Sequence, residues 1–410
     1  MSDPARAFTY RAALSLPGVL RVFPAATGAR LSYAAVPLAL LLTVQDATSS
    51  YSAAGTALGL YGLASLTMPI KARLVDRFGQ RHVLPVLSAV LAGALCVIAF
   101  ASLVGTNSAV PLVLLTLLAG ISAPPIGPSM RALWAALTPE PAARQRAYSL
   151  DSVVEESLYA IGPLAVGLVT AIASPAVALA GAAALNFAGT TMMATSRISI
   201  EHGRPKPRHR DHDNGWLGPF RSPSFLVLAL AMVGVGLGTG PLEVAIAART
   251  EQAGQSGIAG VLFAIIAIGS VIGGLVWGRL PHRRTLPTQL AVLAALAAIG
   301  LVATSLATPI PLLAIALAAT GAVTAPIYTV AYVSSDEFAP PAAQTEASTW
   351  INTSSNLSIG AGTSIAGLLL DHTDPASTLA LAATPLVVTA VTAVAILGRT
   401  APPQGRAETD

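Results

Sequence analysis

Long apolar stretches separated by short polar connections run through the whole chain. A helix that crosses a membrane needs about 20 consecutive, mostly apolar residues, and twelve stretches approach or exceed that length. The pattern therefore predicts an all-α membrane protein with twelve transmembrane helices. The predicted spans are 20–44, 53–71, 83–104, 109–134, 148–172, 176–196, 223–247, 256–279, 286–306, 310–333, 347–370 and 376–397.

A polar and basic segment, 197–222, divides these spans into two groups of six. We expect a six-helix bundle in residues 1–196, a cytoplasmic linker in 197–222 and a second bundle in 223–410. At an offset of about 200 residues the two groups resemble each other, since Gly162 and Gly167 align with Gly362 and Gly367. Such a repeat predicts two pseudo-symmetric bundles with a binding site between them near the middle of the membrane. Pro and Gly in GISAPPIGPSM and TGAVTAPIYT predict bends in the fourth and tenth spans.

The positions of the positive charges predict the orientation. Only 10% of the residues are charged, whereas soluble domains carry about 25%. With both termini in the cytoplasm, all but two of the 23 Lys and Arg residues fall on the cytoplasmic side, the exceptions being Arg30 and Arg249. The net charge of +4 thus indicates topology and attraction to membrane lipid rather than nucleic-acid binding. We expect a monomeric, multi-pass protein of a bacterial-type inner cell membrane.

The sequence lacks the residues that several classes of protein function require. The single cysteine, Cys96, permits no disulfide within the chain, and the six His residues lie in loops or at the ends of spans. The phosphate-binding pattern G-x-x-x-x-G-K-[ST] does not occur, which disfavours ATP-driven transport. We therefore expect no metal, no cofactor and no catalytic residue, and hence no enzyme.

Two adjacent acids, Glu155 and Glu156, lie within the predicted span 148–172. Carboxylates at membrane depth are expensive and mark proton or ion pathways. Adjacent helix residues point about 100° apart, so one of the two can face a cavity directly, and the sequence leaves open which. The alternative is that this helix starts later and both acids lie at the cytoplasmic interface.

Arg30 lies within the first predicted span. An arginine does not lose its charge by deprotonation, so a buried Arg30 needs an anion, either a carboxylate or a substrate. The alternative is a side chain that reaches the cytoplasmic interface from near the helix end. Asn356 aligns with Glu156 in the repeat and is a candidate lining residue of the second bundle.

Glu243 lies in the seventh span, the repeat partner of the first. It follows a glycine-rich run, 234–241, that ends in Pro241 and predicts a kinked or partly unwound helix. Interrupted helices commonly surround the binding sites of transporters. We rank Glu243 as a third functional acid, and the alternative is an outer charge paired with Arg249.

The connection between the second and third spans reads ARLVDRFGQR. It resembles the loop signature G-x-x-x-D-[RK]-x-G-[RK]-[RK] of the major facilitator superfamily, although Ala72 and Gln80 depart from it. The resemblance implies a twelve-helix fold that works by alternating access. It also implies a cytoplasmic gate in which the acid caps a helix of the opposite bundle and the basic residues complete a charge relay. The matching residues are Asp76, Arg77, Gly79 and Arg81.

Gly162, Pro163 and Gly167 lie just after the two acids. They resemble, loosely, the fifth-helix motif G-P-x-x-G-G of the twelve-helix drug:proton antiporter branch, which implies export. The alternative is a kink with close packing of small residues.

Together these features predict a secondary active transporter that exports small organic molecules in exchange for protons. Its expected partners are the small-molecule substrate, protons and membrane lipid. The alternatives are proton-coupled uptake or uniport of a metabolite, or a receptor or scaffold of the same fold that transports nothing.

Overall fold

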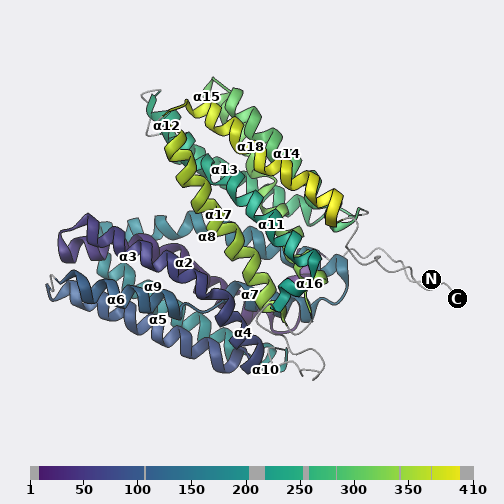
Figure 1. Cartoon of the computed structure of the whole chain (residues 1–410). Helices are drawn as coiled ribbons and strands as arrows, with labels where there is room; N and C mark the ends of the chain where they lie inside the picture. The colour runs from purple at the N-terminus through teal and green to yellow at the C-terminus, as the bar shows by residue number, and fades with distance from the viewer. Residues whose placement is uncertain are drawn as a thin grey trace. The chain divides into compact units, whose positions relative to one another are not determined.

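The architecture is helical throughout (Figure 1). A computed structural model describes residues 9–105, 108–202, 218–252, 258–282, 284–340, 343–370 and 372–397. These residues form α-helices joined by short connections, with a few 3₁₀ turns and one π-helical turn, and they contain no strand. Of the predicted linker, residues 203–217 lie outside this description.

The chain divides into two compact units. We call residues 11–137 and 157–212 the N-terminal unit, and residues 1–10, 138–156 and 213–410 the C-terminal unit. Two helices, α1 (Tyr10–Leu14) and α8 (Pro141–Ile172), contribute residues to both. The division at 1–196 and 223–410 that the repeat suggests stays a prediction.

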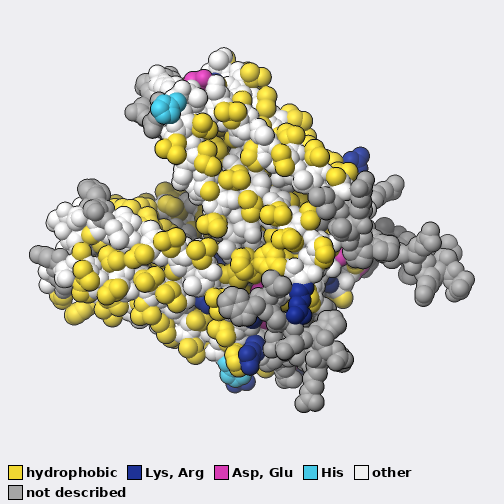
Figure 2. Space-filling model, in the orientation of Figure 1, with side chains coloured by type: hydrophobic (Ala, Val, Ile, Leu, Met, Phe, Trp, Pro, Cys, Tyr) yellow, Lys and Arg dark blue, Asp and Glu magenta, His cyan; other side chains and the backbone are white. Residues whose placement is uncertain are grey.

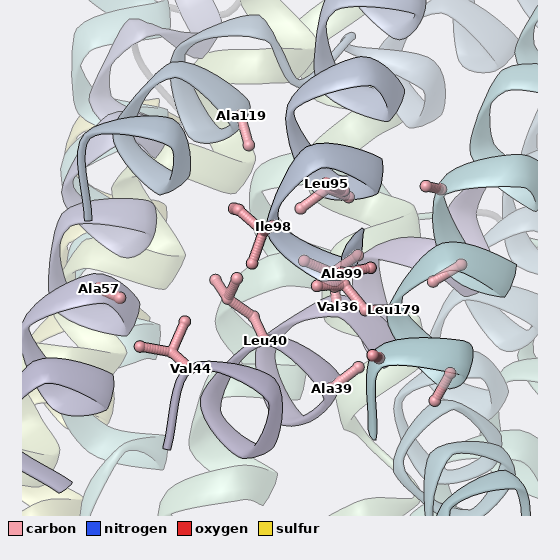
Figure 3. Close-up of a cluster of buried hydrophobic side chains, with 14 of the residues drawn as sticks. Val36, Ala39, Leu40, Val44, Ala57, Leu95, Ile98, Ala99, Ala119 and Leu179 are labelled. Atoms are coloured by element: carbon pink, nitrogen blue, oxygen red, sulfur yellow. The ribbon is translucent and has the colours of Figure 1, made fainter. Parts of the chain in front are cut away.

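In the N-terminal unit, α2 packs along α9, and α9 also packs along α5. The buried side chains between them are Ala, Val, Leu and Ile, with Val36, Leu40, Ile98 and Leu179 at the centre (Figure 3). Small and branched apolar side chains let these helices approach closely. The elements of this unit are α2 (Val19–Thr48), α3 (Tyr51–Leu63), η1 (Ala64–Thr67), α4 (Met68–Phe78), α5 (Gln80–Leu103), α6 (Ala109–Ser122), α7 (Ile126–Leu137), α9 (Pro175–Ala194) and α10 (Arg197–His202).

In the C-terminal unit, α14 packs along α18, and α11 packs along α17. Its elements are η2 (Gly218–Arg221), α11 (Pro223–Thr239), α12 (Pro241–Gln252), α13 (Ala259–Trp277), α14 (Leu286–Leu306), α15 (Ile310–Gly321), α16 (Thr324–Phe338), α17 (Gln344–Leu370), α18 (Pro375–Thr392) and the π-helical turn η5 (Ala393–Leu397).

Eleven helical segments of the described residues are long and apolar enough to cross a membrane. They coincide with eleven of the twelve predicted spans, apart from their ends. The twelfth, 347–370, is the helix α17, which has 27 residues but is more polar than the others. Its buried residues include several Ser and Thr and the acid Glu346, so its polar face contacts protein.

The predicted bends occur where Pro and Gly stand. The fourth span is split between α6 and α7, and the tenth between α15 and α16. The seventh is divided at Gly240, between α11 and α12, but Gly240 keeps helical backbone angles and its bond to the Gly236 carbonyl. The interruption there is the missing N–H of Pro241, and the partly unwound helix expected from the glycine-rich run is not seen at Gly240. The 3₁₀ turn η1 in the second span was not predicted, since no Pro or Gly lies within Ala64–Thr67.

The outer surface is apolar, as contact with lipid requires. Leu, Ile, Val and Phe side chains are exposed along the helices of both units, for example Leu168 and Ile299. Figure 2 shows this apolar cover on one face, where few charged side chains appear. In water such a surface would mark an aggregating protein, whereas in a bilayer it is solvated by the acyl chains.

Side chains bind the carbonyl groups at two helix ends in the C-terminal unit. Arg249 donates to the carbonyls of Thr304, Ser305 and Ala307 at the end of α14. A cation there is favoured by the partial negative charge of a helix C-terminus. The guanidinium of Arg249 is therefore bound to the end of α14, and its pairing with Glu243, whose side chain lies outside the described residues, stays a prediction.

The end of α13 is bound by a tyrosine and a serine. The Tyr10 hydroxyl donates to the Leu275 carbonyl at 2.7 Å, and the Ser149 hydroxyl donates to the Gly274 carbonyl at 2.5 Å. The Arg279 guanidinium lies 5.5 Å from the centre of the Tyr10 ring. Burial raises the pKa of Tyr10, so its hydroxyl keeps its proton and remains a donor.

Glycines in α11 allow α17 and α18 to come close. A Cβ at Gly236 would lie 2.0 Å from Ser358 Oγ and 2.5 Å from the Ser355 carbonyl oxygen, both on α17. A Cβ at Gly238 would lie 2.6 Å from Leu386 Cγ on α18. The glycine-rich run therefore provides close helix packing as well as the interruption.

We predict that Gly236→Ala destabilises the protein by about 1–3 kcal/mol, because the backbone of α17 cannot yield locally to the added methyl group. The matched control is Gly360→Ala on α17, where a Cβ would meet nothing within 4 Å. Thermal unfolding in detergent should show a lower midpoint for Gly236→Ala alone. Equal midpoints for the two variants would contradict this account of the packing.

Candidate functional site

The helix α8 carries the two adjacent acids near its middle. It starts at Pro141, two turns before the predicted start, and continues without a break through Pro163 to Ile172. Glu155 therefore lies about 21 Å along the axis from the first residue, at 1.5 Å per residue. The helix does not start later than predicted, but it is longer than the hydrocarbon core of a bilayer is thick, so the depth of the two acids in the membrane stays a prediction.

Within the C-terminal unit, three tyrosines lie where the first half of α8 packs on α16. We call Tyr148, Tyr328 and Tyr332, with their hydrogen-bond partners, the tyrosine cluster. The Tyr332 ring lies 6.5 Å from the Tyr148 ring and 6.1 Å from the Tyr328 ring, centre to centre. Tyr148 comes from α8 and the other two from α16, so the cluster joins these two helices.

Each hydroxyl of the tyrosine cluster has a polar partner. Tyr148 donates to a carboxylate oxygen of Asp336, and Tyr332 donates to the side-chain carbonyl of Asn352. The hydroxyls of Tyr328 and Ser355 lie 2.6 Å apart. A further contact joins Thr329 to Ser152 at 3.4 Å. The cluster is thus a set of separate hydrogen-bonded pairs that link α16 to α8 and to α17, and ring contacts join its three tyrosines.

Glu155 and Glu156 lie beside the tyrosine cluster. Both are half-buried, and both interact electrostatically with Tyr328. The two carboxylates also lie close enough to repel each other. The site therefore combines a pair of acids with phenol hydroxyls, which are groups that can take up, hold and release protons.

The other candidate residues are Arg30 on α2, Asn356 on α17 and Glu243 on α12. Arg30 is only 4% exposed in the N-terminal unit, and its guanidinium carbon lies 5.9 Å from the centre of the Phe23 ring. A deeply buried position is the one expected of a counter-charge rather than of a side chain that reaches for the interface. Asn356 is exposed on α17. Glu243 belongs to α12, and its side chain lies outside the described residues.

The loop motif forms a tight connection between α4 and α5. Gly79 has φ +84° and joins the two helices directly, a conformation that only glycine adopts without strain. Asp76 is half-buried, while Arg77 and Arg81 are exposed. The position of Asp76 suits an acid that contacts other parts of the protein. The positions of Arg77 and Arg81 suit basic residues that face the membrane surface.

The two departures from the motif lie inside the N-terminal unit. Ala72 is fully buried, so the small residue expected there is still small. Gln80 is also buried, and its amide donates to the Ser129 carbonyl at 3.0 Å. A neutral amide can be buried here without the free-energy cost of burying a charge. Its hydrogen bond to Ser129 does not require a basic residue at this position.

The three residues of the fifth-helix motif behave differently from one another. A Cβ at Gly162 would lie 2.5 Å from the Cβ of Ala34, so Gly162 lets α8 pack on α2. Gly167 has nothing within 4 Å of such an atom. Pro163 lies inside the continuous helix and is exposed. Close packing thus accounts for Gly162, and no contact accounts for Gly167.

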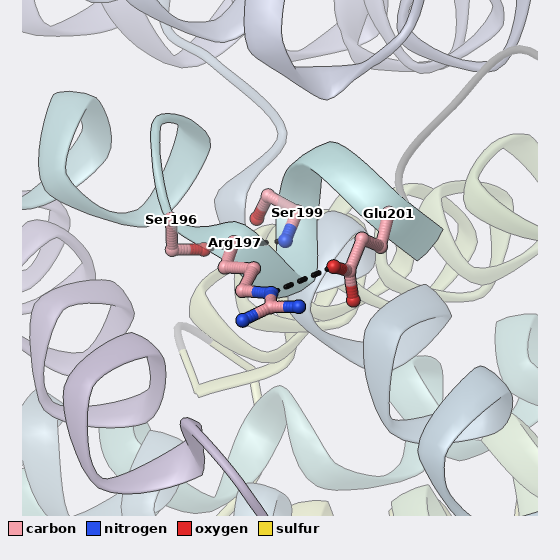
Figure 4. A network of polar contacts seen from close by, with 4 residues as sticks. All are labelled: Ser196, Arg197, Ser199 and Glu201. Carbon is pink, nitrogen blue, oxygen red and sulfur yellow. Dashed lines mark hydrogen bonds and ion pairs between the residues drawn. The ribbon is translucent and has the colours of Figure 1, made fainter.

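The start of the predicted linker is a short helix, α10, with an exposed ion pair. Arg197 Nε and Glu201 Oε1 lie 2.8 Å apart, one turn from each other (Figure 4). The pair raises the pKa of Arg197, through its hydrogen bond to Glu201. Exposed pairs of this kind contribute little to stability, so we assign it no functional role.

Tyr148 and Asp336 are the site residues that the sequence analysis missed. Both lie at or beyond the end of a predicted apolar stretch, yet inside the actual helices α8 and α16. The signal that could have found Tyr148 is Pro141, a residue favoured at the first position of a helix. Among the described residues, no three His, Cys, Asp or Glu side chains come together as metal ligands.

Comparisons with known proteins agree with the helical architecture. The human organic anion transporter MFSD10 (TETRAN) superposes with a TM-score of 0.72 at 17% identity, covering 92% of this chain and 99% of that one. A bacterial homologue of the iron transporter ferroportin, in an outward-facing state, gives 0.73 at 14% identity, covering 92% and 98%. Among curated proteins no relative matches the sequence.

The family model described as Major Facilitator Superfamily matches residues 22–308 and 253–409, which together cover nearly the whole chain. This match and the fold agree with the resemblance carried by Asp76, Arg77, Gly79 and Arg81. The chain belongs to the Major Facilitator Superfamily and is a multi-pass membrane transporter rather than an enzyme.

Proposed function

We propose that the protein exports small organic molecules in exchange for protons, by alternating access between two helical bundles. The observation that carries this proposal is the position of Glu155 and Glu156. They lie near the middle of the membrane-spanning helix α8, half-buried beside Tyr328. Acids at membrane depth that face protein rather than lipid are the usual carriers of protons in transporters.

The tyrosine cluster supports a role for this region in coupling. Its hydroxyls connect α8 with α16 and α17 through hydrogen bonds. A change in the charge of Glu155 or Glu156 acts directly on Tyr328 and can pass to Ser355 and α17. Protonation is thereby linked to the arrangement of three helices, which a coupled transporter requires.

We propose that the direction of transport is export and that the substrate is a small organic molecule. The resemblance of Gly162 and Pro163 to the motif of drug:proton antiporters supports export. A small organic cargo is also what the human organic anion transporter MFSD10 is named for. We place both termini in the cytoplasm, from the distribution of Lys and Arg, with Arg30 as counter-charge and the protein acting as a monomer.

We predict that neutralising the acids abolishes coupling to the proton gradient. Purified protein in proteoliposomes would be given an imposed pH gradient and labelled tetraphenylphosphonium, p-aminohippurate or chloramphenicol, which are cationic, anionic and neutral. Glu155→Gln, Glu156→Gln and Glu243→Gln should each be compared with the parent. At least one variant should lose gradient-driven transport tenfold or more, while keeping downhill exchange.

The control for this experiment is Glu201→Gln, which removes an exposed acid on α10 and should leave transport within twofold of the parent. If all three membrane variants keep gradient-driven transport, the assignment of the proton carriers is wrong. If a compound moves in the same direction as the protons, the protein is an uptake system. If no compound moves although the protein is folded, a receptor or scaffold is favoured.

We predict that Asp76→Asn shifts the balance between inward- and outward-facing states. An acid at a helix N-terminus is worth about 0.3–1 kcal/mol when exposed, so the shift should be about two- to fivefold. Single-molecule distance measurements between labels on the two bundles would detect it. Asp46→Asn, near the C-terminal end of α2, is the matched control, and an unchanged balance in Asp76→Asn would rule out the gate.

A further inference from the structure

The fourth span is interrupted inside the N-terminal unit. α6 ends at Ser122, α7 begins at Ile126, and residues 123–125 between them have no helical hydrogen bonding. Residues 123–131 are all buried. Non-helical backbone at membrane depth is tolerated only where protein or water surrounds it, and here the surrounding material is protein.

Pro124 and Pro128 each remove the helical N–H donor of one carbonyl group at this interruption. In a continuous helix the N–H of each residue bonds to the carbonyl four residues earlier. Pro124 has no N–H for the Gly120 carbonyl, and Pro128 has none for the Pro124 carbonyl. Both carbonyls accept a local backbone bond, from Ala123 and Ile126 respectively, but neither receives its helical partner.

Side chains of other helices supply the missing donors. The Lys71 ammonium, from α4, donates to the Gly120 carbonyl at 3.2 Å. The Tyr33 hydroxyl, from α2, donates to the Pro124 carbonyl at 2.5 Å. Two of the three prolines thus have a matching side-chain donor: Lys71 replaces the N–H of Pro124, and Tyr33 replaces that of Pro128. The third, Pro125, has no matching side-chain donor among the described residues.

The position of Lys71 is unusual for a lysine near a helix end. It lies two turns before the end of α4 at Phe78 and could extend towards the membrane surface, as lysines commonly do. Instead its side chain is only 4% exposed. Within the described part of the chain, the Gly120 carbonyl is its hydrogen-bond partner and no carboxylate pairs with it. Burial of a lysine head group is costly unless the group is hydrogen-bonded, and here the Gly120 carbonyl accepts that bond.

We propose that Lys71 and Tyr33 are positioning residues that hold the interruption of the fourth span open as a bending joint. The joint is fixed to α2 and α4 by these two bonds, so a movement of either helix is transmitted to α6 and α7. Alternating access requires such bends within bundles. The proposal follows from the membership in a transporter family and is independent of proton coupling.

Hydrogen exchange of the full-length protein in lipid nanodiscs tests the joint without a known substrate. Lys71→Met and Tyr33→Phe should each raise the exchange rate of backbone amides in residues 120–131 at least fivefold. Lys71→Arg keeps a donor of similar reach and should stay within twofold of the parent. Unchanged exchange in both Lys71→Met and Tyr33→Phe would overturn the proposal.

The two prolines allow a crossed test. Pro124→Ala returns an N–H to the Gly120 carbonyl, so it should suppress the effect of Lys71→Met but not that of Tyr33→Phe. Pro128→Ala should do the reverse. If a proline substitution merely stabilised the protein in general, it would lower the exchange rate equally in Lys71→Met and Tyr33→Phe. That result, or no effect on either variant, would show that the matched donors do not hold the joint.

Two further controls complete the experiment. Pro37→Ala removes a proline from the uninterrupted helix α2 and should rescue neither variant. If Lys71→Met does not fold, the double variant Lys71→Met with Pro124→Ala should fold, because the carbonyl then has its backbone donor. Failure of that double variant, beside a folded Pro124→Ala, would equally count against the proposal.

Discussion

The satisfaction of backbone carbonyl groups at membrane depth is the constraint on which the rest of this structure depends. An unsatisfied carbonyl in hydrocarbon costs several kcal/mol, yet transport needs helices that bend and end inside the protein. Here the gaps are met by side chains: Lys71 and Tyr33 at the interruption of the fourth span, Arg249 at the end of α14, and Tyr10 at the end of α13. The chain has few polar residues, and these are placed where the backbone needs them.

Close helix approach is the second requirement, and small residues provide it. Lipid gives no hydrophobic drive for helices to associate, so packing and hydrogen bonds must hold them together. Gly162 against Ala34 and Gly236 against α17 show how the absence of a Cβ is used. Close helix packing therefore explains why Gly162 and Gly236 are glycines. It does not explain Gly167, where an added Cβ would have no neighbour within 4 Å.

The spans and their bends could be predicted because both depend on local sequence: apolar length sets the spans, and Pro or Gly sets the bends. Helix ends were predicted less well. Apolar length stops where water begins, whereas the helices α8 and α16 continue to Pro141 and Phe338. Asp336 lies in the extension of α16, and Tyr148 comes directly after the extension of α8. The position of Glu155 within a membrane-spanning helix could be predicted, but the pairing of Lys71 with Gly120 could not, since it joins residues from different helices.

The distribution of charge gives the two units different chemistry. Among the described residues, the fully buried charges of the N-terminal unit are cations, Arg30, Lys71 and Arg131, and those of the C-terminal unit are the acids Asp151 and Glu346. Asp151 is encoded in the first half of the chain, but the first half of α8 packs with the C-terminal unit. The acids that follow it on α8 therefore lie beside Tyr328 of α16, whose hydroxyl contacts Ser355 of α17. Under the proposed proton coupling, uptake of a proton by these acids would first change the hydrogen bonds of the C-terminal unit, although the acids are encoded in the first half of the sequence.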